Sequence, residues 1–221
     1  MKTTQVLNEF FDERPTITFA KKQIVLSPED DTGCFYYIVR GYVRSYSITE
    51  WGDEKLGVIY KSDEMFPLIW IFDQKALTRY YEAMTEVKVK KCRVSEFISF
   101  TEKRPEVLFD LAQKAATILE VFSDRIDCLE YTKAYARVIS LLLHYVRRFG
   151  RKEKDGGVLI QVPISHKDIA NGVAVARETV TRELMKLEKK GLISTNNHHV
   201  KILDPQKLEN ELSSFYSKKL L

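Results

Sequence analysis

Residues 164–193 read ISHKDIANGVAVARETVTRELMKLEKKGLI, and this stretch decides the fold. Ser165 with Asp168 three positions later is the pattern of a helix N-cap, in which side-chain oxygens accept from the free N–H groups of the first turn. The sequence therefore predicts a short helix over residues 166–171. Residues 172–174 are small and suit a tight turn after it.

A second helix is predicted over residues 177–190, followed directly by Gly191, a residue type that commonly ends a helix. Its apolar residues Val180, Leu184 and Leu187 are spaced four and three apart, so they form one stripe that packs inward. Two short helices joined by a tight turn form a helix-turn-helix. The first turns of its second helix enter the major groove of DNA.

The polar side of the second helix carries residue types that bind DNA. Arg177 and Arg182 match the O6 and N7 atoms of guanine, and Glu178 is able to accept from the N4 of cytosine. Thr179 is short enough to reach a phosphate. The solvated face of an ordinary amphipathic helix would look similar, so the residue types alone leave both interpretations open. The candidate DNA contacts are Ser165, His166, Arg177, Glu178, Thr179, Thr181 and Arg182.

The residues after the second helix predict a wing. Residues 192–195 and 198–203 read as two short strands around a turn at Asn196-Asn197. A β-hairpin in this place favours the DNA-binding interpretation over the solvated helix.

The run at residues 177–193, RETVTRELMKLEKKGLI, resembles the recognition helix and following strand of the Crp/Fnr transcription regulators. The resemblance implies that Arg177, Glu178 and Arg182 read bases and that Thr179 contacts a phosphate. Two neighbouring positions depart from the family pattern. Ala174 stands where a turn glycine is usual, and Ala176 stands where Ser or Thr often caps the second helix. The missing cap is expected to cost about 1 kcal/mol of helix stability.

The pattern changes to short β-branched and aromatic runs between Ile17 and Val94, after a short helix expected within residues 1–14. Such runs, separated by turn residues, predict an all-β sandwich or barrel. Residues 37–43, YIVRGYV, resemble the strand-glycine-strand signature of the family's effector domain. That resemblance implies a small β-roll made of two sheets.

A long helix is predicted to begin at Pro105. Seven of its apolar residues alternate in spacing between four and three, which is the seam of a coiled coil and favours a homodimer. A helix buried in its own monomer is the alternative. A two-fold dimer would set two recognition helices about 34 Å apart, one turn of DNA, and the resemblance implies the same. Leu111, Ile118 and Val121 lie beside the seam and are expected to pack on the β-domain. The seam residues are Leu108, Ala112, Ala115, Leu119, Phe122, Ile126 and Leu129.

These features predict an α+β chain in three parts. Residues 1–104 form a double-stranded β-helix, a jelly-roll-like β-roll that acts as effector domain. Residues 105–131 form the dimerisation helix, and residues 132–221 form the winged helix-turn-helix. Residues 1–132 carry 18 Lys+Arg and 22 Asp+Glu, net −4, whereas residues 133–221 carry 17 and 9, net +8. A basic half joined to an acidic half is typical of a nucleic-acid domain attached to a different domain.

No cofactor is predicted. In the family, cyclic nucleotides are held by a Gly-Glu pair and a following arginine, and residues 64–72, EMFPLIWIF, lack that pair. Arg79 falls near the place of the phosphate-binding arginine, yet a surface residue would fit equally. An iron–sulfur cluster needs four ligands and the chain has three scattered cysteines. His198 and His199 are adjacent on a strand and point to opposite faces, so no metal site is expected.

An apolar run replaces the cyclic-nucleotide signature. It is either a β-domain core filled by its own aromatic residues or a pocket for a hydrophobic effector. The filled core is the simpler interpretation, because aromatic stripes are more often core. The candidate pocket residues are Phe66, Leu68, Trp70, Phe72 and Arg79.

Other classes of function have less support in the sequence. No nucleophile–base constellation, carboxylate pair or glycine-rich phosphate loop indicates an enzyme. A protein-interaction module without sequence-specific DNA readout is the main alternative. No apolar run is long enough to span a membrane and no signal peptide is recognised, so a cytoplasmic protein is expected. The expected partners are an inverted repeat in double-stranded DNA, a second copy of the chain and RNA polymerase.

Overall fold

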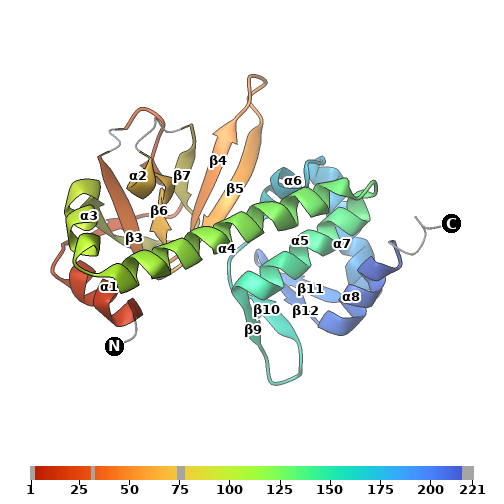
Figure 1. Cartoon of the computed structure of the whole chain (residues 1–221). Coiled ribbons are helices and arrows are strands. Elements are labelled where there is room, and N and C mark those ends of the chain that lie inside the picture. Colours follow the sequence, from red (N-terminus) through yellow and green to blue (C-terminus); the bar gives the residue numbers. More distant parts are fainter. Residues whose placement is uncertain (1–2, 31–32, 74–77, 216–221) are drawn as a thin grey trace. The chain divides into compact units, whose positions relative to one another are not determined.

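The computed structural model describes residues 3–30, 33–73 and 78–215 (Figure 1). The chain divides into two compact units, Met1–Glu120 and Val121–Leu221. The division falls inside the long helix α4 (Pro105–Glu130), which therefore belongs to both units. The sequence instead predicted this helix as a part of its own.

Unit 1 contains two four-stranded antiparallel sheets, which confirm the predicted double-sheet β-roll. The first sheet has the order β1 (Thr16–Phe19), β8 (Val87–Arg93), β3 (Cys34–Arg40) and β6 (Met65–Phe66). The second has the order β2 (Ile24–Leu26), β7 (Tyr80–Ala83), β4 (Val43–Ile48) and β5 (Glu54–Tyr60). In β8, buried valines alternate with more exposed lysines, because successive side chains of a strand point to opposite faces.

Gly41 joins β3 to β4 in the predicted strand-glycine-strand signature. Its φ is +98°, a conformation that L side chains rarely adopt. A Cβ atom at this position would lie 2.4 Å from the carbonyl oxygen of Glu86. Both the backbone angle and the close approach therefore require glycine.

Besides α4, the described residues of unit 1 form three helices: α1 (Thr3–Asp12), α2 (Ile69–Phe72) and α3 (Val94–Glu102). The sequence placed Val94 in a strand, but β8 ends at Arg93 and Val94 begins α3. The core between α1, α3 and β3 is aromatic. Phe11 stacks on Tyr37 with ring centroids 4.4 Å apart, and the Phe35 and Phe97 centroids are 5.0 Å apart.

The two sides of α4 differ in burial. Val107 and Leu111 are fully buried in the core of unit 1 and Ile118 packs against it, as predicted for Leu111 and Ile118. Val121 is also buried and belongs to unit 2. The predicted seam is largely exposed, with Leu119 at 69% and Ile126 at 62%. Only Ala115 among the seam residues packs partly against the core of unit 1. Within the described residues the helix is thus buried on one side and leaves most of the seam accessible, while the dimer itself stays a prediction.

Unit 2 begins with the last turns of α4 and continues, after a break at residues 131–133, into α5 (Ala134–Phe149). Asp124 of α4 holds two residues of α5. Its Oδ2 lies 2.8 Å from His144 Nδ1 and accepts from Arg147 Nη2 at 2.8 Å. Cys128 is buried against α5, where its thiol lies 3.2 Å from the carbonyl oxygen of Arg137.

The helix-turn-helix consists of α6 (His166–Val173) and α7 (Arg177–Lys189), both packed on α5. A four-stranded sheet accompanies them, in the order β11 (Ile193–Asn196), β12 (His199–Ile202), β10 (Val158–Ile160) and β9 (Gly150–Lys152). The wing turn lies at Asn197-His198, both with positive φ, and not at Asn196-Asn197. Positive φ at both central residues is what a two-residue hairpin turn of type I′ demands, and it fixes the register one residue later than predicted.

The helix α8 (Pro205–Ser213) contacts the residue that follows α7. Asp204 caps it by accepting from the Lys207 amide at 3.0 Å, and Leu208 is fully buried. Glu211 Oε1 accepts from Lys190 Nζ at 2.6 Å and from the Tyr135 hydroxyl at 3.1 Å. One carboxylate of α8 thus connects the residue after α7 to α5.

Candidate functional site

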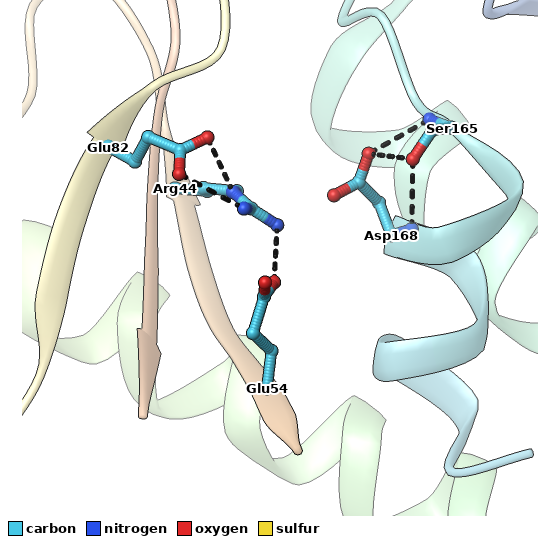
Figure 2. A network of polar contacts seen from close by, with 5 residues as sticks. All are labelled: Arg44, Glu54, Glu82, Ser165 and Asp168. Carbon is cyan, nitrogen blue, oxygen red and sulfur yellow. Dashed lines mark hydrogen bonds and ion pairs between the residues drawn. The ribbon is translucent and has the colours of Figure 1, made fainter. Parts of the chain in front are cut away.

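The start of α6 is fixed by a capping box, drawn in Figure 2. Ser165 Oγ accepts from the Asp168 amide at 3.1 Å and donates to Asp168 Oδ2 at 2.6 Å, while the Ser165 amide donates to the same carboxylate at 2.9 Å. The predicted N-cap is therefore correct. Because its hydroxyl is committed to the cap, Ser165 positions the helix and has no remaining proton to offer to DNA.

The turn between the helices contains a residue in the left-handed conformation, at the position where the sequence resemblance expected glycine. α6 runs to Val173, two residues beyond the predicted end, and Ala174 follows in the left-handed conformation with φ of 54°. For a residue with a Cβ atom this conformation costs roughly 1–2 kcal/mol. Ala176 precedes α7 and makes no side-chain cap bond. Both departures weaken the motif locally while the two helices keep their places.

The recognition helix α7 separates an apolar side from a polar side. Val180, Leu184 and Leu187 are buried, which confirms the predicted stripe. Arg177, Glu178 and Arg182, predicted to read bases, are exposed. The exposure leaves these three side chains accessible to a ligand as large as duplex DNA.

The predicted base-reading residues differ in how firmly they are held. Arg182 Nη2 donates to Thr179 Oγ1 at 3.3 Å. Within the described part of the chain, the Arg177 guanidinium and the Glu178 carboxylate make no hydrogen bond or ion pair. Groups without a protein partner lose no internal bond when they bind bases.

His166 and Thr181 are brought together from the two helices. His166 Nδ1 lies 2.9 Å from Thr181 Oγ1, and that hydroxyl donates to the Arg177 carbonyl oxygen at 3.1 Å. Because the threonine proton is used in this way, Nδ1 must be the donor, which leaves Nε2 unprotonated in the neutral ring. Partial burial and the charges of Arg177 and His198 hold the pKa of His166 below its ordinary value.

One exposed side chain of α7 was not among the predicted contacts. Met185 is 51% exposed and lies one helical turn after Arg182. Its neighbour Lys186 donates to both carboxylate oxygens of the buried Glu183, at 2.9 and 2.8 Å. In the sequence, Met185 follows Arg182 by three positions, which places both on one side of the helix. An apolar residue at that position is equally compatible with a place in the core, so the sequence did not identify Met185 as a contact.

The candidate effector residues differ in burial and in their neighbours. Phe66 is fully buried and stacks with Tyr36 and Tyr81, at centroid distances of 5.6 and 5.3 Å. Leu68 belongs instead to the core around α1 and α3, and Trp70 is buried. Phe72 is 56% exposed, and the predicted pocket shared by these four residues stays a prediction. Phe66 lies in β6 and Leu68 directly precedes α2, whereas Trp70 and Phe72 lie on α2.

Arg79 lies over the backbone of β5. A Cβ atom added to Gly57 would be 2.9 Å from Arg79 Nη1 and 2.5 Å from Ser45 Oγ. Burial raises the pKa of the nearby Tyr81 to about 12, with the Arg79 charge acting in the opposite direction. Arg79 is therefore half-buried among strand residues of unit 1, away from the fully exposed surface position that the sequence left open. The proposed place of Arg79 in an effector pocket stays a prediction.

The described residues contain no group of three or more His, Cys, Asp or Glu side chains that could hold a metal ion. No helix within residues 3–30, 33–73 and 78–215 is long and apolar enough to cross a membrane. The three cysteines are unpaired, and burial raises the pKa of Cys92 to about 11.

Two domain families match the chain. Residues 136–211 match the Crp-like helix-turn-helix domain, and residues 16–104 match the cyclic nucleotide-binding domain. The global nitrogen regulator of Synechococcus elongatus is 26% identical over 199 residues, 88% of each chain. The nitrogen fixation regulation protein FixK of Bradyrhizobium diazoefficiens is 27% identical over 204 residues, 92% of this chain and 84% of that one.

Solved structures share the fold of both units. FixK2 from Bradyrhizobium japonicum superposes with a TM-score of 0.76 at 21% identity, covering 89% of this chain and 96% of that one. A CooA mutant from Carboxydothermus hydrogenoformans gives a TM-score of 0.78 at 19% identity and covers 96% of each chain. The likeness extends over almost the whole of the described chain.

Proposed function

The chain belongs to the Crp/Fnr family of DNA-binding transcription regulators, and from this premise we propose that it binds an inverted-repeat DNA site as a homodimer. The observation that carries the proposal is the exposed polar side of α7, opposite a buried stripe. Arg177, Glu178 and Arg182 would read bases from this side. Thr179 and His166 would contact the backbone beside them.

The dimer rests on α4. A row of largely exposed apolar side chains runs from Leu108 to Leu129 of this 26-residue helix, and a second copy of the same row would cover it. A two-fold pair of chains would then present two recognition helices, which is why an inverted repeat is the matching DNA.

Glu178→Ala and Arg182→Ala test the base-reading roles. Loss of Glu178 is expected to relax the preference at one base pair in each half-site, because its acceptor is matched to a cytosine amino group. Loss of Arg182 is expected to cost roughly 1–3 kcal/mol for each bidentate guanine contact. The measurement is selection of bound duplexes from a randomised pool, followed by affinity titration of the selected site.

Glu209→Ala is the matched control, since Glu209 is an exposed carboxylate on α8, outside the helix-turn-helix. It should select the same site as the wild type. If the Glu178 and Arg182 variants also select that site with unchanged affinity, the assigned base contacts are wrong.

DNA binding is expected to tighten as the pH falls from 7.5 to 6.0. A phosphate near His166 would favour the imidazolium, so binding would raise a pKa that lies below its ordinary value in the free protein. Each pKa unit gained contributes about tenfold in affinity at pH values below the free pKa. Titrations at constant ionic strength should show this slope for the wild type and a flatter one for His166→Gln.

The stability of the free protein should change in the opposite direction. The pKa of His166 is lower in the folded protein than in the unfolded chain, so the unfolded chain takes up the proton first. His166 therefore lowers the free energy of unfolding as the pH falls through its pKa in the unfolded chain.

The DNA-binding test has a clear contrary outcome. Identical pH slopes of DNA binding for the wild type and His166→Gln would remove His166 from the interface.

A further inference from the structure

Met185 stands in the middle of the exposed side of α7. Residues 178, 182, 185 and 189 share one side of a helix, because they are separated by four, three and four positions. Three of these positions carry charged side chains, Glu178, Arg182 and Lys189. The fourth is Met185, which is 51% exposed.

The fold does not account for this methionine. The other apolar residues of α7 are Val180, Leu184 and Leu187, and all three are buried against the rest of unit 2. Met185 is thus the single apolar side chain of α7 that is left in solvent. A flexible thioether among charged groups contributes little to stability, yet it presents an apolar surface to whatever that side of the helix contacts.

Duplex DNA offers one apolar group in the major groove, the 5-methyl group of thymine. We propose that Met185 determines specificity by packing on a thymine methyl group in each half-site. The inference rests on the proposed function, in which the Arg182 side of α7 faces the groove. Met185 lies one turn beyond Arg182, so its thymine neighbours the base pair that Arg182 reads. It also lies about 12 Å along the helix from Arg177, so it contacts a different part of the half-site.

The test removes the methyl group from the DNA and the thioether from the protein. Full-length wild type is first used to select its preferred duplex from a randomised pool. Each thymine of a half-site is then replaced in turn by deoxyuridine, which lacks only the 5-methyl group. Affinities of the wild type and of Met185→Ala are measured for every duplex, and thermal melting establishes that the variant is folded.

The wild type is expected to lose about fourfold in affinity at one thymine of each half-site, the effect of one buried methyl group. Met185→Ala should show no loss at that thymine. Met185→Leu should keep the loss, because it retains an apolar side chain, and Met185→Gln should not. Lys189→Ala on the same side of α7 is the matched control. It should weaken all duplexes alike and leave the uracil effect in place.

The outcomes separate this inference from the proposed function. If the wild type selects no preferred duplex, the sequence-specific function fails and Met185 has no site to read. If it selects one, and the uracil effects of the wild type and Met185→Ala are equal at every thymine, the role of Met185 is overturned while the function stands.

Discussion

Between 50 and 200 mM salt, the affinity of the dimer for its inverted repeat is expected to fall by about 10³–10⁵. A protein that neutralises about 6–10 phosphates releases the cations condensed on them, and added salt opposes that release. Residues 133–221, which contain the helix-turn-helix, carry a net charge of +8 from 17 Lys+Arg and 9 Asp+Glu. Their excess of positive charge is sufficient for several phosphate contacts in each chain.

The measurement is fluorescence anisotropy of a labelled duplex across the salt range at one pH. The slope of log affinity against log salt should be about −0.9 for each phosphate contacted. Lys189→Ala removes an exposed cation of α7 and is expected to reduce the magnitude of the slope by about one per chain. A slope near zero for the wild type would favour the protein-interaction module over DNA binding.

Leu119→Asp is expected to convert the dimer into a monomer and to lower affinity for the inverted repeat by about 10²–10⁴. Leu119 is 69% exposed in the single chain, so the change disturbs no core. In a dimer it would place a carboxylate inside an apolar seam, where an unpaired charge is strongly destabilising. Without the dimer, the second half-site no longer adds to binding.

Two measurements separate loss of the dimer from loss of DNA binding by each chain. Light scattering gives the mass in solution, and titrations give the affinity for duplexes with one and with two half-sites. The variant should bind a single half-site as the wild-type monomer would, and should gain little from the second. Thr117→Asp is the matched control, because Thr117 is exposed two positions before Leu119 and off the seam. A dimeric Leu119→Asp protein would mean that another surface holds the two chains together.

The helices of unit 2 could be predicted because their signals are local. Ser165, Asp168 and Gly191 mark helix ends within a few residues, and each lies where the sequence placed it. α3 was missed because its first residues follow β8 directly, with no capping side chain at Arg93. The strand β9 was missed because its three residues are all exposed, so no alternation of apolar and polar residues reveals it.

Features that depend on distant parts of the chain could not be read from the sequence. The position of Arg79 beside Gly57 brings together the residue before β7 and a residue of β5, which are 22 positions apart in the chain. The register of the wing depends on which two residues form the turn with positive φ. The residue types of Asn196-Asn197 suit such a turn as well as those of Asn197-His198, which the structure shows. Met185 stood out only once the burial of the other apolar residues of α7 was known.

The division of the chain inside α4 decides where the protein can be cut. A fragment starting at residue 132, the boundary suggested by the sequence, would lack Val121 and Cys128, both buried in unit 2. It would also lose Asp124, the carboxylate that holds His144 and Arg147. A stable DNA-binding fragment should therefore begin at or before Val121 and retain the last three turns of the helix.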